Sequence, residues 1–323
     1  MKNIQIDLFS TTDRRLPIAF GNIDQLSKVS QTNLDNLLLK IFCYRCHETQ
    51  WKNKMATTNI PFEICPMPSP GETQGYTGYD YKERTRICLE SPCKYSVRID
   101  DDIFISTPLW NFMLSTMDEV LSQERVHAYC PVYSTGMPSV DFFIEDFLSP
   151  EDQEFMGTIF KRESVHARPW FPQCDYTHIQ EAIDKMDKWD SKEYWKEVLR
   201  HNTVFQSIHP MRFSSEGNLF LAKRIFENFN KILDEQDYEC IAIEGMPNSH
   251  WTCTRTANWR RAVAEFGPQD PFDEMSMQCN ERKYGLTTVY IKRGFSIHPC
   301  HGYVPNREKI DEDYAAFISK IGK

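Results

Sequence analysis

The sequence predicts an α/β fold in which a mainly parallel sheet is flanked by helices and carries a helical insertion lobe. Three observations lead to this prediction. Short apolar runs alternate with segments of helical periodicity over residues 4–135, which is the pattern of βαβ units. Strand-like segments return at 240–245 and 287–293. Between these two parts, residues 149–231 are rich in charge and aromatic side chains and contain no convincing strand.

Strand and helix signals alternate from the start of the chain. The apolar run IQIDLFS at 4–10 stops at a polar cluster, as expected for a strand that leads into a ligand-facing loop. A helix is expected near 23–29, a buried strand at 37–43, a helix near 48–55 and a strand at 60–65. The order strand, helix, strand, helix, strand therefore predicts a parallel arrangement of the first strands.

The next expected elements precede and follow an acidic run at 100–102. Residues 66–80 are dense in Pro, Gly, Ser and Thr and predict a loop that could form a lid. A helix-compatible stretch at 79–91 precedes a strand at 95–99, which ends at the acids. The remaining expected elements are a helix at 110–123, a strand at 127–133, a turn at 134–138, and helices at 256–265 and 271–283.

Composition indicates a compact globular protein. The chain has 323 residues, of which 41% are hydrophobic and 13% aromatic. A net charge of −9 gives no overall attraction to nucleic acid or anionic lipid, although a local basic patch could still act. No apolar run approaches the ~20 residues that span a bilayer, and the charged start of the chain does not suit a signal peptide, so a cytoplasmic protein is expected. Eleven cysteines without a framework spacing indicate reduced thiols.

Three consecutive acids follow the strand at 95–99. Asp100, Asp101 and Asp102 concentrate negative charge at the carboxyl end of a strand, where open α/β sheets bind ligands. Carboxylates this close repel one another unless a cation neutralises them, and their hard oxygens suit Mg²⁺ or Mn²⁺. Strand alternation would make Asp100 and Asp102 the pair at the metal. Apolar neighbours favour a buried strand over a solvated turn: Val97, Ile99, Ile103 and Ile105.

A second source of metal ligands lies near the end of the chain. The segment GFSIHPCHG at 294–302 carries His298 and His301 in a turn bounded by Gly and Pro. An imidazole can complete a manganese site that is dominated by carboxylates. A structural or solvated histidine is the alternative interpretation of each.

The order of these features resembles the GT-A superfamily of glycosyltransferases, in which a strand ends in a DxD-type acid cluster and a histidine follows late in the chain. The resemblance implies that Asp102 is the primary ligand of a Mn²⁺ or Mg²⁺ ion. It implies that Asp100 supports this site through the ribose or a metal-bound water, and that His298 and His301 compete as further ligands. Asp101 would contact the bound cofactor or serve only the structure.

The same resemblance implies a nucleotide-sugar donor, expected to be UDP-linked. The loop after the first strand would grip the nucleotide through Thr11, Thr12 and Arg14, and Lys82 and Arg86 would lie near the diphosphate. The resemblance covers residues 4–135 and 240–302. It divides the chain into a nucleotide-sugar-binding half at 1–148, a helical insertion or lobe at 149–235 and an acceptor-side half at 236–323.

An inverting member of this superfamily needs a carboxylate base for the acceptor hydroxyl. The segment DPFDEMSM at 270–277 offers Asp273 and Glu274 in the opening turn of an expected helix. The alternative is a helix-capping role, because acids in a first turn gain about 0.3–1 kcal/mol from the helix dipole.

Two further signals have competing interpretations. Cys43 to His47 matches the C-x-x-C-H haem pattern, but haem attachment requires export, so a core or strand-end cysteine pair is favoured. The segment 250–262 interleaves tryptophans with arginines and could stack bases or sugars, although a helix with buried tryptophans is favoured. The residues in question are Trp251, Arg255, Trp259, Arg260 and Arg261, followed as candidates by Arg162, His166, Arg168 and Trp170.

The leading hypothesis is sugar transfer from a nucleotide donor to a hydroxyl of a glycan, a small molecule or a modified base in DNA, as in some viral glycosyltransferases. A nucleotidyltransferase is an alternative, but such enzymes carry a glycine-rich basic loop after the first strand, and TTDRRLPIAFG lacks those glycines. A non-catalytic nucleotide-binding module is the third possibility.

Overall fold

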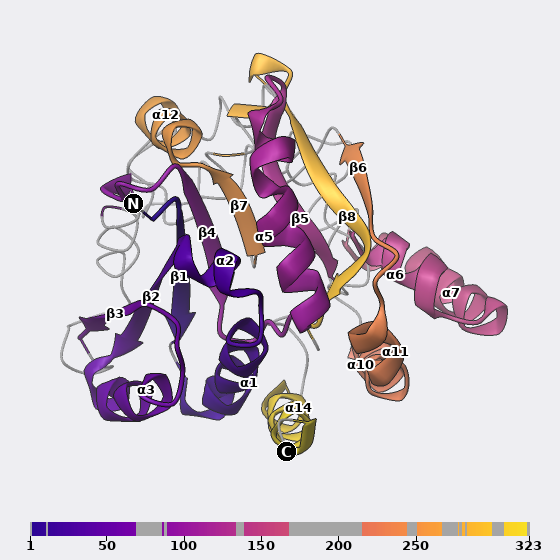
Figure 1. The fold of residues 1–323 in the computed structure, drawn as a ribbon. Helices are drawn as coiled ribbons and strands as arrows, with labels where there is room; N and C mark the ends of the chain where they lie inside the picture. Colours follow the sequence, from indigo (N-terminus) through magenta and orange to yellow (C-terminus); the bar gives the residue numbers. More distant parts are fainter. Residues whose placement is uncertain are drawn as a thin grey trace, which may run out of the picture.

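The computed structural model describes residues 2–10, 12–68, 86, 89–133, 139–167, 215–243, 251–266, 277, 280–281, 283–298 and 307–321. Within these residues the chain forms one eight-stranded sheet in the order β3-β2-β1-β4-β7-β5-β8-β6, with helices on both faces (Figure 1). The predicted fold class, a mostly parallel α/β sheet flanked by helices, is confirmed.

The sheet is parallel except at two strands. β1 pairs in parallel with β2 and β4, β2 with β3, and β5 with β8. β7 runs antiparallel between β4 and β5, and β6 runs antiparallel beside β8. The strand bounds are β1 (Ile4–Ser10), β2 (Leu37–Tyr44), β3 (Phe62–Met67), β4 (Tyr95–Asp100), β5 (Val126–Tyr133), β6 (Glu239–Ile243), β7 (Trp251–Arg255) and β8 (Thr287–Ser296).

Two apolar clusters hold the helices against the sheet, one on each face. On one face, Leu8 and Val97 meet buried side chains of the first helices, including Trp51 and Trp110. On the other face, β5 and β8 meet a second cluster of aromatic side chains. The helices are η1 (Asp13–Arg15), α1 (Leu16–Leu26), α2 (Gln31–Asp35), η2 (Arg45–His47), α3 (Glu48–Met55), α5 (Thr107–Ser122), α6 (Ser139–Phe147), α7 (Pro150–Ala167), α10 (Ser215–Glu227), α11 (Phe229–Asp234), α12 (Thr256–Phe266) and α14 (Arg307–Ile321).

The first helix begins earlier than predicted. α1 starts at Leu16, has a proline in its first turn and ends at Leu26, whereas the expected helix spans 23–29. Proline suits a first helical turn because its missing N–H needs no partner there. Leu16, Ala19, Ile23 and Leu26 then fall on one buried face. The strand at 4–10 and the helix at 48–55 are confirmed to the residue.

The sequence prediction missed β7. Trp251–Arg255 forms a strand, and the helix that follows begins only at Thr256. Trp251 and Cys253 join the apolar cluster on one face, while Thr254 is buried on the other. The segment WTCTR does alternate in polarity, but its five residues are too few to outweigh the helical periodicity of the residues that follow.

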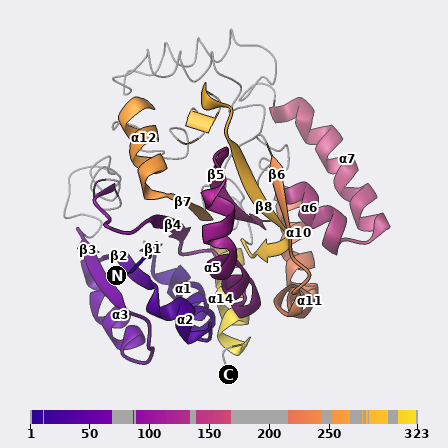
Figure 2. The ribbon, with the colours of Figure 1, turned by 45° about the horizontal axis from the view of Figure 1, so that its top comes forward.

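Of the helices after β5, α7 lies beyond the β6 edge of the sheet in both views (Figures 1 and 2), whereas α6 packs against β5 and β8. Arg224 of α10 donates to Asp152 of α7 at 2.6 Å and ties two of them together. The boundaries at 149 and 235 remain a prediction, because residues 168–214 lie outside the described part. Of the helices that the structure describes, none combines the length and apolar character needed to cross a bilayer.

Candidate functional site

The carboxyl ends of β1 and β4 meet at the point where the strand order reverses. From β1 the chain builds outward through β2 and β3, and then β4 returns to the other side of β1. The register sets Phe9 of β1 beside Asp100 of β4. η1 follows β1 directly and the acidic run follows β4, so both lie at the crevice where open α/β sheets bind ligands.

β8 brings a histidine to the same edge. β8 runs parallel to β5, and its end continues into a bridge between Phe104 and Ile297, with N···O distances of 2.8 and 3.0 Å. This bridge sets His298 Nε2 3.4 Å from Asp102 Oδ2. Both side chains are buried, at 1% and 5% exposure. The residue proposed as primary ligand and one of the two candidate histidines therefore lie side by side.

The three acids are unequal, but not as strand alternation predicts. β4 ends at Asp100, and Asp101 and Asp102 form a turn in which Ile103 N donates to Asp100 O. Period-two alternation does not continue through a turn. Asp101 and Asp102 are consequently buried and face the same cation, whereas the Asp100 side chain is 26% exposed and lies 4.0 Å from Arg98.

The cation that faces both buried acids is Arg15, whereas the sequence predicted a role at the nucleotide for its neighbour Arg14. Arg15 Nη1 lies 3.2 Å from Asp101 Oδ1 and 2.9 Å from Asp102 Oδ2. Its Nε lies 3.4 Å from Oδ2 of Asp311 on α14. Burial alone would lower the pKa of Arg15, but the charges of these three carboxylates outweigh burial and raise it above its ordinary value. Arg15 therefore carries its charge throughout the physiological pH range.

Two other residues predicted to contact the nucleotide, Arg14 and Arg86, form ion pairs of their own. The Arg14 side chain is 43% exposed and pairs with Glu308 at 2.6 Å. Thr12 precedes η1, and among the described residues no hydrogen bond reaches its buried hydroxyl. Arg86 forms an exposed pair with Glu90, at 2.6 Å. Five candidates lie outside the described residues: Thr11, Lys82, Asp273, Glu274 and His301.

The donor atoms at this edge suit a divalent cation that shares its coordination sphere with a ligand. A carboxylate oxygen and an imidazole nitrogen face each other across 3.4 Å, and both types of atom bind Mn²⁺. Within the described part of the chain, no three His, Cys, Asp or Glu side chains are arranged to enclose a metal ion. Two protein donors nevertheless suffice where phosphate oxygens and water complete the sphere, as is usual for Mg²⁺ bound with nucleotides.

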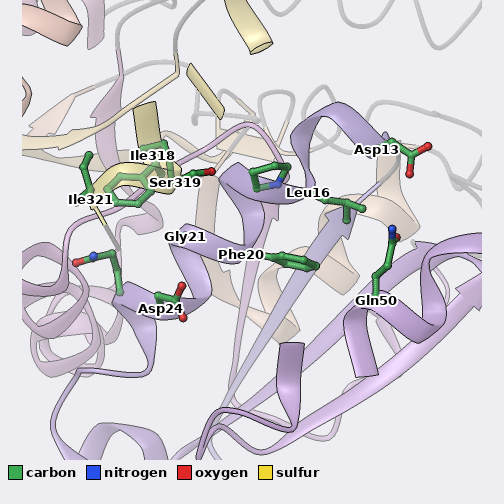
Figure 3. A pocket seen from close by; sticks show the side chains of 12 residues that line it. Asp13, Leu16, Phe20, Gly21, Asp24, Gln50, Ile318, Ser319 and Ile321 are labelled. Atoms are coloured by element: carbon green, nitrogen blue, oxygen red, sulfur yellow. The ribbon is translucent and has the colours of Figure 1, made fainter. Parts of the chain in front are cut away.

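A pocket of about 460 Å³ lies beside this edge, against α1 (Figure 3). It runs over α1, with Gln50 of α3 on one side and Ile318 of α14 on the other. Phe20 projects into it from α1. Asp13 reaches the pocket from η1, but Asp100, Asp101 and Asp102 do not line it. The pocket therefore flanks the acid cluster rather than containing it.

The tryptophans of the 250–262 segment are not available to stack on a ligand. Trp251 is 0% and Trp259 4% exposed, which confirms the interpretation that places both in the core. Arg260 donates to two backbone carbonyls, those of Leu89 and Ser91. Arg255 donates to Val126 O. The alternative prediction, that these tryptophans stack on bases or sugars, is therefore wrong. Arg162 and His166 lie in α7, and Arg168 and Trp170 lie outside the described residues.

The C-x-x-C-H segment has a structural role. Cys43 is buried in β2, Cys46 is exposed, and both are free thiols. His47 Nε2 lies 2.6 Å from Asp13 Oδ1, so η2 is tied to η1 across the ends of β2 and β1. Burial raises the pKa of the Cys43 thiol to about 12, so the thiol is protonated and a poor nucleophile at neutral pH.

Comparison with known proteins gives structural likeness only. No family model and no curated protein matches the chain. Mouse xyloside xylosyltransferase 1 in its apo form aligns with a TM-score of 0.40 at 7% identity, over 88% of this chain and 84% of that one. S. aureus TarS in complex with UDP-GlcNAc aligns at 0.33 and 10%, over 71% and 73%. 4-Diphosphocytidyl-2C-methyl-D-erythritol synthase from Anaerococcus prevotii aligns at 0.29 and 10%, where the match spans 41% of this chain and 55% of the synthase.

Proposed function

We propose that this protein is a metal-dependent glycosyltransferase that moves a sugar from a nucleotide-sugar donor, UDP-linked by expectation, to an acceptor hydroxyl. One observation carries the proposal. Asp102 and His298 come from distant parts of the chain and meet at 3.4 Å, at the edge where the sheet reverses its strand order. A carboxylate and an imidazole buried together at such an edge suit a cation that carries a diphosphate.

Each residue at the edge has a definite part in this proposal. Asp102 and His298 hold the cation, which would offset the charge that develops on the leaving diphosphate. Asp100, the most exposed of the three acids, would contact the ribose or a metal-bound water. The buried hydroxyl of Thr12 supplies a hydrogen-bond partner for the nucleotide at the end of β1.

The base that activates the acceptor remains a prediction. Asp273 and Glu274 are its candidates, and Asp273→Asn and Glu274→Gln should each be assayed for turnover. Normal turnover in both variants would mean that the base lies elsewhere or that the sugar retains its configuration. The acceptor is a glycan, a small molecule or a modified base in DNA, and the net charge of −9 does not favour DNA.

Hydrolysis of a panel of nucleotide-sugars, with and without Mn²⁺, tests the proposal. We expect one donor to be hydrolysed only with the metal, and Asp102→Asn and His298→Gln each to lower kcat/KM by about a hundredfold or more. Asp118→Asn is the matched control, because Asp118 is a 74%-exposed acid on α5 that pairs with Lys94. Metal-independent hydrolysis, or unchanged turnover in Asp102→Asn, would contradict the proposal.

Two further measurements separate the alternative functions: pyrophosphate release from a nucleoside triphosphate in the presence of a sugar phosphate, and thermal stabilisation by the nucleotide-sugars. A nucleotidyltransferase would join a sugar phosphate to a nucleoside triphosphate and release pyrophosphate from the triphosphate. It would not hydrolyse nucleotide-sugars. A non-catalytic module would be stabilised by a nucleotide-sugar without turning it over.

A further inference from the structure

One guanidinium joins three segments of the chain at the candidate site. Arg15 leaves η1 after β1, Asp101 and Asp102 follow β4, and Asp311 belongs to the C-terminal helix α14. The Arg15 side chain is 17% exposed, whereas the acid side chains are only 2%, 5% and 6% exposed. Three carboxylates this deeply buried need a positive partner, and Arg15 supplies it.

The carboxylate oxygen of Asp102 that Arg15 contacts is also the oxygen nearest to His298 in the proposed metal site. Asp102 Oδ2 lies 2.9 Å from Arg15 Nη1 and 3.4 Å from His298 Nε2. A divalent ion bound between Asp102 and His298 would sit within a few ångströms of Nη1. Two positive centres at such a separation repel each other strongly in a buried site. Arg15 and the divalent ion therefore compete for the same oxygen.

Asp311 offers the displaced guanidinium another position. Arg15 contacts Asp311 through Nε, whereas it contacts Asp101 and Asp102 through Nη1, so the two sets of contacts use different nitrogens. α14 has anchors of its own: Arg14 pairs with Glu308, and the Tyr314 hydroxyl donates to Ile297 O at 3.2 Å. The helix can hold Asp311 in place while the guanidinium turns.

We infer that Arg15 is a built-in counter-cation that holds Asp101 and Asp102 in position without a divalent ion, and that the incoming ion displaces it toward Asp311. This inference rests on the proposed function, because it assumes that Asp102 binds the ion. Arg15 is then a positioning residue: it keeps the acid cluster formed before the ion arrives, and it lowers the affinity for the ion.

Mn²⁺ binding to the full chain without nucleotide, measured by the electron paramagnetic resonance signal of the free ion, tests the inference. Arg15→Gln removes the competing charge, so we expect it to bind Mn²⁺ about tenfold more tightly than the unaltered protein. Without metal the same variant should melt at a lower temperature, because its acids repel one another. Arg125→Gln is the matched control and should change Mn²⁺ affinity less than about twofold, since Arg125 is exposed, precedes the first residue of β5 and donates to Gly285 O.

A second set of variants keeps the test decisive if Arg15→Gln folds poorly. Asp311→Asn removes the alternative position of the guanidinium and should weaken Mn²⁺ binding. In the Arg15→Gln background the same substitution should have a much smaller effect, because Asp311 no longer has a guanidinium to receive. Arg15→Lys keeps the charge but not the fork, and should bind Mn²⁺ with an affinity between those of the unaltered protein and Arg15→Gln.

The outcomes distinguish this inference from the proposed function. If the unaltered protein binds Mn²⁺ and Arg15→Gln binds it equally or more weakly, the inference is wrong and the proposed function stands. An equal effect of Asp311→Asn in both backgrounds would also overturn it. If neither the unaltered protein nor Arg15→Gln binds Mn²⁺, the metal site itself is wrong, and the inference fails with it.

Discussion

At the scale of single residues, the buried histidines His298 and His127 lie in contrasting surroundings. His298 lies beside a carboxylate, Asp102, at the ligand edge of the sheet. His127 is 0% exposed on β5, where Asn280 Nδ2 donates to its Nδ1 at 3.2 Å and its Nε2 lies 3.0 Å from Met277 Sδ. These contacts suit a neutral imidazole with its proton on Nε2. His298 therefore lies beside a charged group, whereas the buried surroundings of His127 disfavour a charge on its imidazole.

His127 predicts a loss of stability in mild acid. Burial, together with the charges of Arg261 and Arg255, lowers the pKa of His127 to about 3, from 6.5 in an unfolded chain. Between these values the unfolded state binds the extra proton, so the stability contribution is complete above pH 6.5 and is lost as the pH falls toward 3. We expect His127→Gln, which cannot titrate, to lose less unfolding free energy than the unaltered protein between pH 6.5 and 5, by about 2 kcal/mol.

Urea unfolding at pH 7, 6.5 and 5 measures this difference. The comparison depends on the slopes and not on the absolute values, since Gln in place of His127 also loses packing. If the two proteins show the same dependence of unfolding free energy on pH, folding does not lower the pKa of His127 and the prediction is wrong.

At the scale of residues, part of the candidate site could be predicted from the sequence. Asp102 and His298 could be named because each stands at the end of an apolar strand, and parallel strands end at one edge. Arg15 could not be chosen over Arg14, since the two are adjacent and equally basic. The choice depends on α14, which brings Asp311 to one arginine and Glu308 to the other.

At the scale of elements, the close approach of α1 and α14 holds the C-terminal helix at the site. Gly21 lies where the helices touch: a Cβ added there would sit 2.3 Å from Ile318 Cγ2 and 3.4 Å from the Phe104 ring. Only a glycine allows this distance. Because Asp311 lies on the same helix, the spacing of α1 and α14 also sets the position of Arg15 between its acids.

Gly21→Ala should lower the free energy of unfolding by about 1–3 kcal/mol, because the added methyl group overpacks the contact. Adding Ile318→Ala to this variant should cost less than the same change in the unaltered protein, since it removes the clashing methyl. Gly157→Ala is the matched control. Gly157 is an exposed glycine of α7 with no atom within 4 Å of an added Cβ, so alanine should stabilise the protein by up to about 1 kcal/mol. Urea unfolding of the four variants gives these values, and a neutral Gly21→Ala would contradict the close packing.

Elements with simple periodicity were predictable, and one strand was not. β1 and α3 follow directly from their patterns. β7 did not, because its five residues are too few for a clear periodic signal, and its partners β4 and β5 lie more than a hundred residues earlier in the chain. Pairing with distant segments, rather than local propensity, decides its conformation.

At the scale of the whole molecule, the chain contributes to the site from both ends. β7 comes late in the sequence but inserts between β4 and β5, and β8 returns beside β5. This interleaving joins η1, the acid run, His298 and Asp311 at one edge. Fold class was predictable because alternating strands and helices allow few arrangements. The convergence of Asp102, His298, Arg15 and Asp311 was not, since it depends on where the last strand and helix dock.

The most direct test of the central claim is anomalous diffraction at the manganese edge from crystals that contain Mn²⁺ and UDP. We expect one strong peak, about 2.2 Å from an Asp102 carboxylate oxygen and from His298 Nε2, with diphosphate oxygens completing the sphere. The peak should be absent in Asp102→Asn crystals grown under the same conditions. A peak at another acidic cluster, or no peak beside Asp102 in crystals that hold UDP, would contradict the assignment of this edge as a metal and nucleotide site.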